Sequence, residues 1–260
     1  MRPIAGKVCS VCGEQVLSSY ADLEPDGQRR CPICRRIERP FARAVAYGSY
    51  DGGLRELIHL LKYNGVRPAA NVLGRMLAEA ITGLESSFPQ QLSFTPEPIV
   101  LIPVPLFKAR RRQREFNQAE LIARAALKLQ PLQGRLEFAP DLLRRVRDTH
   151  SQIGLTSHQR RENMRGAFAV PHPAEVAGRE VLLVDDVYTT GTTVTECAKV
   201  LRRAGASRVW VATVARTLKL ASNQQATFQG VNVSEFQGAS SEPSENSETL
   251  HPEGLETLQP

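Results

Sequence analysis

One stretch of the chain, residues 181 to 214, constrains the fold more than any other. Val181 to Val184 form an apolar run that predicts a fully buried strand, and Val209 to Val214 predict a second one. Between them, apolar residues at helical spacing predict a helix that is followed by Gly205. A strand, a helix and a parallel strand connect through a right-handed crossover. The sequence therefore predicts an α/β fold with a mainly parallel sheet.

The loop between the first strand and this helix carries the candidate chemistry. Asp185 and Asp186 follow the strand, and small hydroxyl residues then surround a glycine: Thr189, Thr190, Gly191, Thr192 and Thr193. Such a loop at a helix N-terminus gathers backbone N–H groups, hydroxyls and the positive end of the helix dipole, which favours a bound phosphate. The chain has neither a GxxxxGK[ST] nor a GxGxxG loop.

The two aspartates need a partner other than phosphate, because carboxylates repel it. Neutral hydroxyl groups or a bound cation would suit them, and a 5-phosphorylated ribose brings both a phosphate for the loop and hydroxyls for Asp185 and Asp186. The alternative is that the two carboxylates only cap the helix.

Four of the five cysteines lie near the N-terminus as two CxxC pairs, Cys9 with Cys12 and Cys31 with Cys34. This spacing is typical of a structural zinc site, in which four thiolates complete a closed tetrahedral shell. The alternatives are four unliganded thiols or a redox pair. Cys197 lies at helical spacing among apolar residues and is predicted to be a small core residue.

Charge divides the chain into a basic body and an acidic end. The net charge is +6, but the last forty residues hold six Glu and no Lys, Arg or Asp, which leaves +12 on the rest. A basic body indicates an anionic partner, either phosphorylated small molecules or nucleic acid. Residues 221–260 are rich in Ser, Gln, Asn, Glu and Pro and are predicted to be disordered.

No apolar run is long enough to cross a bilayer and no export signal is visible, so a cytoplasmic protein without membrane insertion is expected.

The middle of the chain supplies the remaining predicted elements. Residues 54–80 predict two short helices separated by a turn near Gly65, and Ile99 to Ile102 predict a buried strand. A basic loop is expected from Lys108 to Arg114, followed by a helix over residues 118–129. Between Lys108 and Arg165, 14 Lys or Arg face 6 Asp or Glu. Open α/β sheets bind ligands at the carboxyl ends of their strands, where this charge follows.

One motif and five further segments, which occur in the family's order, make a family resemblance visible. VLLVDDVYTTGTT resembles the phosphoribosyl-pyrophosphate (PRPP) binding motif of type I phosphoribosyltransferases, and residues 9 to about 216 resemble the ComF family of competence-associated proteins. The other segments are the two CxxC pairs, LKYNG at 61–65, IPVPL at 102–106, RRRQREFNQAEL at 110–121 and QIGLTSHQRRENMRGAF at 152–168. One departure is Glu115, where the family usually has Gly. It loses glycine's backbone freedom and adds a negative charge beside the expected pyrophosphate site, which disfavours tight pyrophosphate binding.

The resemblance implies a Rossmann-like phosphoribosyltransferase core over residues 41–220, a zinc module over residues 1–40 and the tail over residues 221–260. It implies that Asp185 and Asp186 hold the ribose, that Thr189 to Thr193 hold the 5-phosphate, and that Mg²⁺ accompanies PRPP. It also implies that a set of basic and polar residues binds pyrophosphate or belongs to a mobile loop that covers the substrate. These residues are Arg110, Arg111, Arg112, Arg114, Gln152, Arg160, Arg161 and Asn163.

Three functions follow from these observations. The first is transfer of a phosphoribosyl group to a nitrogen acceptor with release of pyrophosphate. The second is single-stranded DNA binding in DNA uptake together with other competence proteins, for which exposed aromatic residues are expected to be few. The third is a PRPP or nucleotide sensor without turnover. No histidine has an evident Ser or Cys partner, and His59 is predicted to belong to the core. A substrate contact by His150 or His158, which lie in the segment of the expected mobile loop, is left open. The acceptor and the oligomeric state do not follow from the sequence.

Overall fold

The computed structural model describes residue 4 and residues 6–16, 27–85, 98–129, 134–149 and 156–218, all within one compact unit, Met1–Ser222. The predicted tail lies outside these residues. The elements, in chain order, are α1 (Pro32–Arg36), β1 (Arg43–Ser49), α2 (Gly52–Asn64), α3 (Ala69–Glu85), β2 (Ile99–Pro103), α4 (Lys108–Arg114), α5 (Gln118–Leu127), β3 (Leu136–Phe138), β4 (Arg144–Arg145), α6 (Ser157–Met164), β5 (Phe168–Ala169), the 3₁₀ helix η2 (Pro173–Glu175), β6 (Glu180–Tyr188), α7 (Thr192–Arg203) and β7 (Arg208–Arg216).

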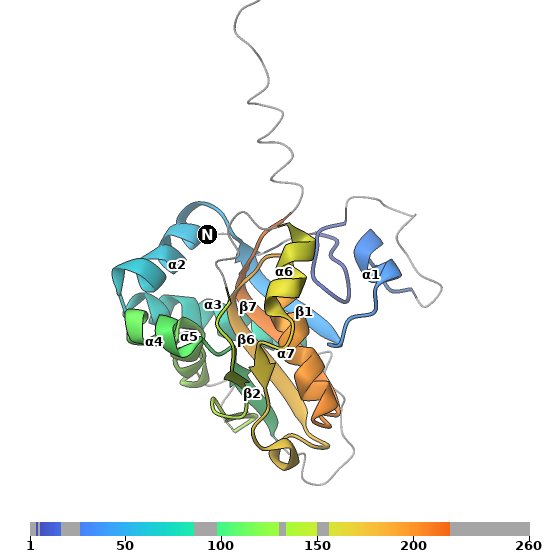
Figure 1. Ribbon diagram of the computed structural model, residues 1–260. Helices are drawn as coiled ribbons and strands as arrows, with labels where there is room; N and C mark the ends of the chain where they lie inside the picture. The colour runs from blue at the N-terminus through green and yellow to red at the C-terminus, as the bar shows by residue number, and fades with distance from the viewer. Residues whose placement is uncertain are drawn as a thin grey trace, which may run out of the picture. The chain divides into compact units, whose positions relative to one another are not determined.

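The centre of this unit is a five-stranded sheet in the order β1-β7-β6-β2-β3, and every neighbouring pair in it is parallel (Figure 1). A separate antiparallel pair joins β4 to β5. The α/β class and the mainly parallel sheet predicted from the sequence are therefore confirmed.

Alternation along β6 divides the core into two faces. Val181 and Leu183 pack in one cluster with α7 residues such as Leu201, whereas Leu182 and Val184 pack in a second cluster with α2, α3 and α5. This period of two is what a strand buried on both faces produces, because successive side chains point to opposite sides of a sheet. Figure 1 shows α7 in front of the sheet and α3 behind it.

The N-terminal segment shares the first of these clusters. Cys9, Cys12, Cys31 and Cys34 are buried together with Phe41, Tyr188 and Val194. Backbone hydrogen bonds attach the segment to the sheet, since the N–H of Ala44 donates to the carbonyl of Val11 at 2.7 Å. The cysteine-bearing segment is thus built into the core of the larger domain.

Several elements differ from the prediction. Lys108 to Arg114 form the helix α4 where a basic loop was expected, because Lys, Ala, Arg and Gln are strong helix formers and no Gly or Pro interrupts them. The strand predicted at 181–184 continues to Tyr188 as β6, so that both aspartates lie within it. The edge strands β1 and β3 were not predicted. The break between α2 and α3 is confirmed, with Gly65 in the left-handed conformation at φ 66°.

Two further residues singled out in the sequence lie in the described part of the chain. Cys197 is fully buried against the sheet, as expected for a core residue. His59, predicted to belong to the core, is instead half-buried and lines a surface hollow, because its face of α2 is only partly covered; its Nε2 lies 3.0 Å from the Tyr50 hydroxyl. Among the described residues, none of the helices has both the length and the apolar content that a bilayer-spanning segment needs.

Candidate functional site

The two aspartates lie side by side near the end of β6, close to the carboxyl edge of the sheet. Asp185 is half-buried and its Oδ1 accepts a hydrogen bond of 2.9 Å from the backbone N–H of Asp186, whose side chain is buried. Burial raises the pKa of the Asp185 carboxyl well above its ordinary value, and the negative charge of Asp186 raises it further. A site with this electrostatic character stabilises a cation or a hydroxyl donor.

A lysine from a distant part of the sequence supplies such a cation. Lys62, on α2, forms an ion pair with the Asp186 carboxylate, and the two side chains are 15% and 6% exposed. Burial disfavours the charge on Lys62, but the attraction of Asp186 outweighs it and the pKa of the ammonium is raised. The sequence analysis assigned Lys62 no role. The signal was its position one helical turn after Ile58, on the apolar face of α2, where a lysine is unusual.

The hydroxyl-rich loop begins directly after β6 and ends at α7. Gly191 is the N-cap of α7 with φ 75°, and no side chain caps the helix there. A helix N-terminus without a side-chain cap leaves its first N–H groups available to an anion. Thr190 and Thr192 lie on either side of Gly191 with their hydroxyl oxygens 2.8 Å apart. The predicted phosphate loop therefore has the geometry of an anion site, and β6 places it next to the two aspartates.

Two arginines form a second cationic group, and one of them, Arg145, interacts electrostatically with Asp185. Arg110 donates to the backbone carbonyl of Thr149 at 3.3 Å, and Arg145 donates to the hydroxyl of the same residue. Burial lowers the pKa of Arg145 and the positive charge of Arg110 lowers it further, whereas Cys197, Asp148 and Asp185 partly offset this decrease. The structure thus joins Arg110, which was predicted, to Arg145, which was not, because β4 carries Arg145 from a segment that only the tertiary fold brings here.

The remaining basic residues of α4 make separate contacts. Arg111 lies 3.8 Å from the carboxylate of Glu120, Arg114 donates to the side-chain oxygen of Gln118 at 3.1 Å, and Arg112 is exposed. Glu115 ends α4 with φ 64°, and it is the one non-glycine residue with positive φ in the described part of the chain. A left-handed conformation is the reason that glycine is favoured at this position.

Of the four residues assigned to a mobile loop, three lie in the described part of the chain and one lies outside it. Arg160, Arg161 and Asn163 lie on α6, which begins at a capping box between Thr156 and Gln159 and packs against α7. These three residues are therefore helical, and Gln152 lies outside the described residues.

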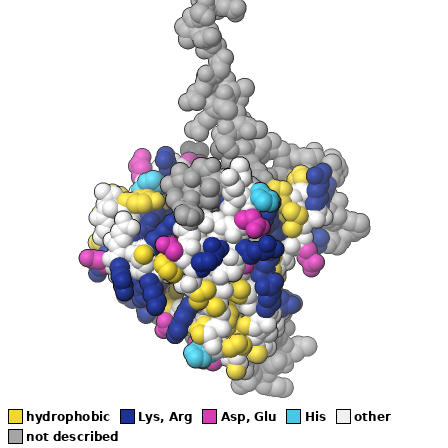
Figure 2. Space-filling model, viewed as in Figure 1, with side chains coloured by type: hydrophobic (Ala, Val, Ile, Leu, Met, Phe, Trp, Pro, Cys, Tyr) yellow, Lys and Arg dark blue, Asp and Glu magenta, His cyan; other side chains and the backbone are white. Residues whose placement is uncertain are grey.

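A cavity of about 330 Å³ opens beside Lys62. Tyr63 is 63% exposed at this cavity, and the guanidinium carbon of Arg114 lies 5.2 Å from the centre of its ring. Arg67 lies 5.5 Å from the centre of the Phe116 ring and pairs with Glu115 at 3.3 Å. The cavity is lined by Lys62, Tyr63, Gly65, Arg67, Gln113, Arg114, Glu115 and Phe116. In Figure 2, Lys and Arg side chains are spread over the visible face of the molecule, with fewer acidic ones among them.

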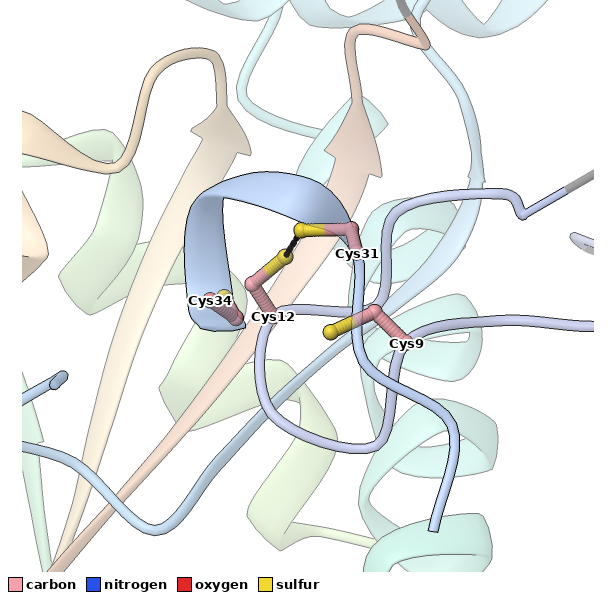
Figure 3. A group of neighbouring side chains, drawn as sticks. All are labelled: Cys9, Cys12, Cys31 and Cys34. Carbon is pink, nitrogen blue, oxygen red and sulfur yellow. Dashed lines mark hydrogen bonds between the residues drawn. The ribbon is translucent and has the colours of Figure 1, made fainter. Parts of the chain in front are cut away.

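The four N-terminal cysteines form a candidate metal centre. Their sulfur atoms all lie within 4.8 Å of one another and all four residues are buried. Figure 3 shows Cys9 and Cys12 on one loop facing Cys31 and Cys34 at the turn of α1. The sulfur atoms of Cys12 and Cys31 lie 3.7 Å apart. Hydrogen bonds from Cys12 and Cys34 lower the pKa of the Cys31 thiol to about 6. Four converging sulfur atoms fit a tetrahedral metal ion.

Comparison with known proteins places the sequence among phosphoribosyltransferase-like and competence proteins. Residues 131–248 match the family described as phosphoribosyl transferase domain. The chain is 34% identical over 220 residues to DNA utilization protein YhgH of Escherichia coli O157:H7, covering 81% of this chain and 91% of that protein. It is 32% identical over 211 residues to Competence protein F of Haemophilus influenzae, covering 80% and 84% respectively.

One solved structure, the glutamine PRPP amidotransferase from B. subtilis in complex with ADP and GMP, is 23% identical and covers 57% of this chain and 26% of that one, with a TM-score of 0.34. A TM-score this low supports no conclusion about the fold or the function of this chain. The similarity to YhgH and to Competence protein F extends over most of each chain, and the family assignment rests on it. The chain therefore belongs to the ComF family of competence-associated proteins, with a phosphoribosyltransferase-like domain.

Proposed function

We propose that this protein binds PRPP or a 5-phosphoribosyl nucleotide and transfers the phosphoribosyl group to a nitrogen acceptor. The observation that carries the proposal is the arrangement along β6: two carboxylates, one of them paired with the buried Lys62, stand directly before an uncapped helix N-terminus. In the proposed complex the loop from Thr189 to Thr193 binds the 5-phosphate. The ribose 2- and 3-hydroxyls donate to Asp185 and Asp186.

The reaction follows from these contacts. The acceptor nitrogen forms a bond to ribose C1 as the bond from C1 to the pyrophosphate oxygen breaks, and the nitrogen then loses its proton. Positive charge develops on the sugar, and the nearby carboxylates of Asp185 and Asp186 stabilise it. Arg110 and Arg145, which share Thr149 as a hydrogen-bond partner, are the groups we assign to the departing pyrophosphate.

The two metals have separate roles in the proposal. Asp185 and Asp186 provide the oxygen ligands that Mg²⁺ prefers, and the ion pair with Lys62 supports the view that these carboxylates accept a cation. Mg²⁺ would neutralise charge on pyrophosphate when bound. We assign Zn²⁺ to the four cysteines in a structural role, since four thiolates leave no position for substrate. Reduced thiols also support a cytoplasmic location.

The test is calorimetric titration of the zinc-loaded protein with PRPP and Mg²⁺. Saturable binding is expected, and Asp185→Asn together with Asp186→Asn should abolish it without changing the zinc content. Asp141→Asn, an exposed carboxylate in the segment between β3 and β4, is the matched control and should bind as the parent does. Unchanged PRPP affinity in the double variant would overturn the ribose assignment.

A second function, single-stranded DNA binding, is favoured by the cavity at Tyr63. An exposed aromatic ring in contact with Arg114, in a cavity that Arg67 also lines, offers a stacking surface and phosphate contacts, which is the combination that single-strand binders use. Few exposed aromatic residues were expected from the sequence, because the burial of an individual aromatic residue depends on the fold. The names of the relatives, DNA utilization protein and Competence protein F, are consistent with this function.

Tyr63→Ala and Tyr63→Phe separate the two functions. Binding of an oligothymidylate should weaken about tenfold or more in Tyr63→Ala and remain in Tyr63→Phe, since a base stacks on either ring. If DNA binds and PRPP does not, the protein is a DNA-binding factor that keeps the fold without the transfer reaction. If PRPP binds without turnover for any acceptor, the protein acts as a sensor.

A further inference from the structure

The candidate metal centre and the phosphate loop are connected through two buried side chains at the ends of neighbouring strands. Tyr188 is the last residue of β6 and Arg216 the last residue of β7, and the two residues pair across the sheet. The Arg216 guanidinium carbon lies 4.4 Å from the centre of the Tyr188 ring, and the residues are 4% and 3% exposed. Neither side chain is needed to describe the fold or the proposed reaction.

Arg216 is attached to the loop that carries the first cysteine pair. It donates to the backbone carbonyl of Cys12, its Nη2 lies 3.8 Å from the sulfur of Cys12, and the same nitrogen donates to the Glu14 carboxylate at 2.8 Å. Four thiolates around a divalent cation leave two negative charges in excess. This negative charge compensates the positive charge of a buried guanidinium beside the site. The position of Arg216 therefore depends on the folded cysteine loop.

Tyr188 continues the connection into the phosphate loop. A Cβ atom placed on Gly191, the N-cap of α7, would lie 2.2 Å from the Tyr188 hydroxyl, so the loop backbone is packed directly on this ring. The hydroxyl is buried, and no hydrogen-bond partner is found for it among the described residues. The ring thus acts through packing, since it contacts both the guanidinium of Arg216 and the loop backbone at Gly191.

A second connection leaves from the other cysteine pair. Arg39, which follows α1 in the chain, donates to the hydroxyl of Thr195 in the first turn of α7 at 3.4 Å. Each cysteine pair is therefore linked to the N-terminus of α7 by one arginine, Cys12 through Arg216 and the α1 segment through Arg39.

We infer that Arg216 and Tyr188 are positioning residues that couple the metal centre to the phosphate loop, so that zinc and a 5-phosphate each strengthen the binding of the other. The inference rests on the proposed function, because it requires the loop at Gly191 to bind a phosphate. Coupling between two sites is reciprocal, and an effect of about fivefold or more on each affinity is typical.

The experiment measures zinc release from the wild-type protein to a chromogenic chelator, with and without ribose 5-phosphate. The buried Trp210 is the only tryptophan of the chain, and its fluorescence reports global unfolding in the same sample. We expect ribose 5-phosphate to raise the protein's affinity for zinc, measured in competition with the chelator, by about fivefold. The Trp210 fluorescence should stay unchanged. Release that occurs only together with the Trp210 change, or that is the same with and without ribose 5-phosphate, overturns the coupling.

Two variants locate the connection. Arg216→Lys keeps the charge but loses the planar group that stacks on Tyr188 and bonds the Cys12 loop. It should retain one zinc per chain, bind ribose 5-phosphate about fivefold more weakly and lose the effect of this ligand on zinc. The matched control is Arg208→Lys at the other end of β7, where Arg208 lies 5.5 Å from the Trp210 ring and pairs with Glu180 at 3.4 Å. It should behave as wild type.

The outcomes separate the coupling from the proposed function. Failure of ribose 5-phosphate to bind the zinc-loaded wild type overturns the proposed phosphate site and, with it, the coupling. Normal binding without any effect on zinc overturns the coupling alone. An equal loss of coupling in Arg216→Lys and Arg208→Lys overturns the assignment to Arg216 and Tyr188.

Discussion

Lys62 on α2 and Asp186 on β6 form a largely buried ion pair that links a helix to the strand of the proposed site. The two residues are far apart in the sequence and come from elements that meet only in the folded protein. Their pairing sets the charge of the site: it neutralises Asp186 and leaves Asp185 as the carboxyl with the raised pKa.

Loss of Lys62 should destabilise the protein. Lys62→Met leaves the Asp186 carboxylate buried without its cation, and breaking a buried pair in this way costs about 3 kcal/mol. Urea unfolding at pH 7 measures the change. Lys62→Met combined with Asp186→Asn removes both charges and should recover most of the lost stability. A double variant as unstable as Lys62→Met alone would show that the pair is not the cause.

The pH dependence of stability should report on Asp185. Because its pKa is raised in the folded state, the folded protein holds this proton more tightly than the unfolded chain does. The stabilisation is complete below the ordinary carboxyl pKa and is lost as the pH rises through the raised value, at a rate approaching 1.4 kcal/mol per pH unit. Asp185→Asn carries no titrating group and should lose this slope. Unfolding free energies from pH 4 to pH 8 test it, and an unchanged slope would contradict the assignment.

Replacement of Glu115 should separate backbone strain from charge. Glu115→Gly relieves a left-handed conformation and should raise the free energy of unfolding by about 1 kcal/mol. Glu115→Gln keeps the side chain and removes the charge, and since Glu115 is 77% exposed its stability should change by less than about 0.5 kcal/mol. If the charge weakens pyrophosphate binding, calorimetry should show tighter binding in both variants. Tighter binding in Glu115→Gly alone would assign the effect to the backbone.

The cysteine cluster should bind one zinc ion per chain. Cys31→Ser removes one of four converging sulfur atoms and should lower the zinc content and the unfolding temperature, because the metal stabilises only the folded arrangement. Cys197→Ser is the matched control, since this cysteine is equally buried but lies on α7 outside the cluster. Metal analysis under reducing conditions should give one zinc for the control. Full zinc content in Cys31→Ser would contradict a four-cysteine site.

Local sequence patterns predicted several of the observed elements correctly. The apolar run at Val181 to Val184 forms a strand buried on both faces, the break at Gly65 separates two helices, and the two CxxC pairs converge. Each of these features depends on residues close together in the chain. Errors arose where local signals were weak or opposed: α4 contains like charges that favoured a loop, but its helix propensity prevailed, and β1 lacks a marked apolar run.

The sequence by itself determined the α/β class, the aspartate pair before a threonine-rich loop and the cysteine cluster, because each depends on consecutive or regularly spaced residues. Only the tertiary structure decided which distant side chains complete them. Lys62 reaches Asp186 from α2, Arg145 meets Arg110 on Thr149, and Arg216 joins Cys12 to Tyr188. These contacts depend on how helices pack on the sheet and on which strands are neighbours, and a pattern of residue spacing along one chain does not contain that information.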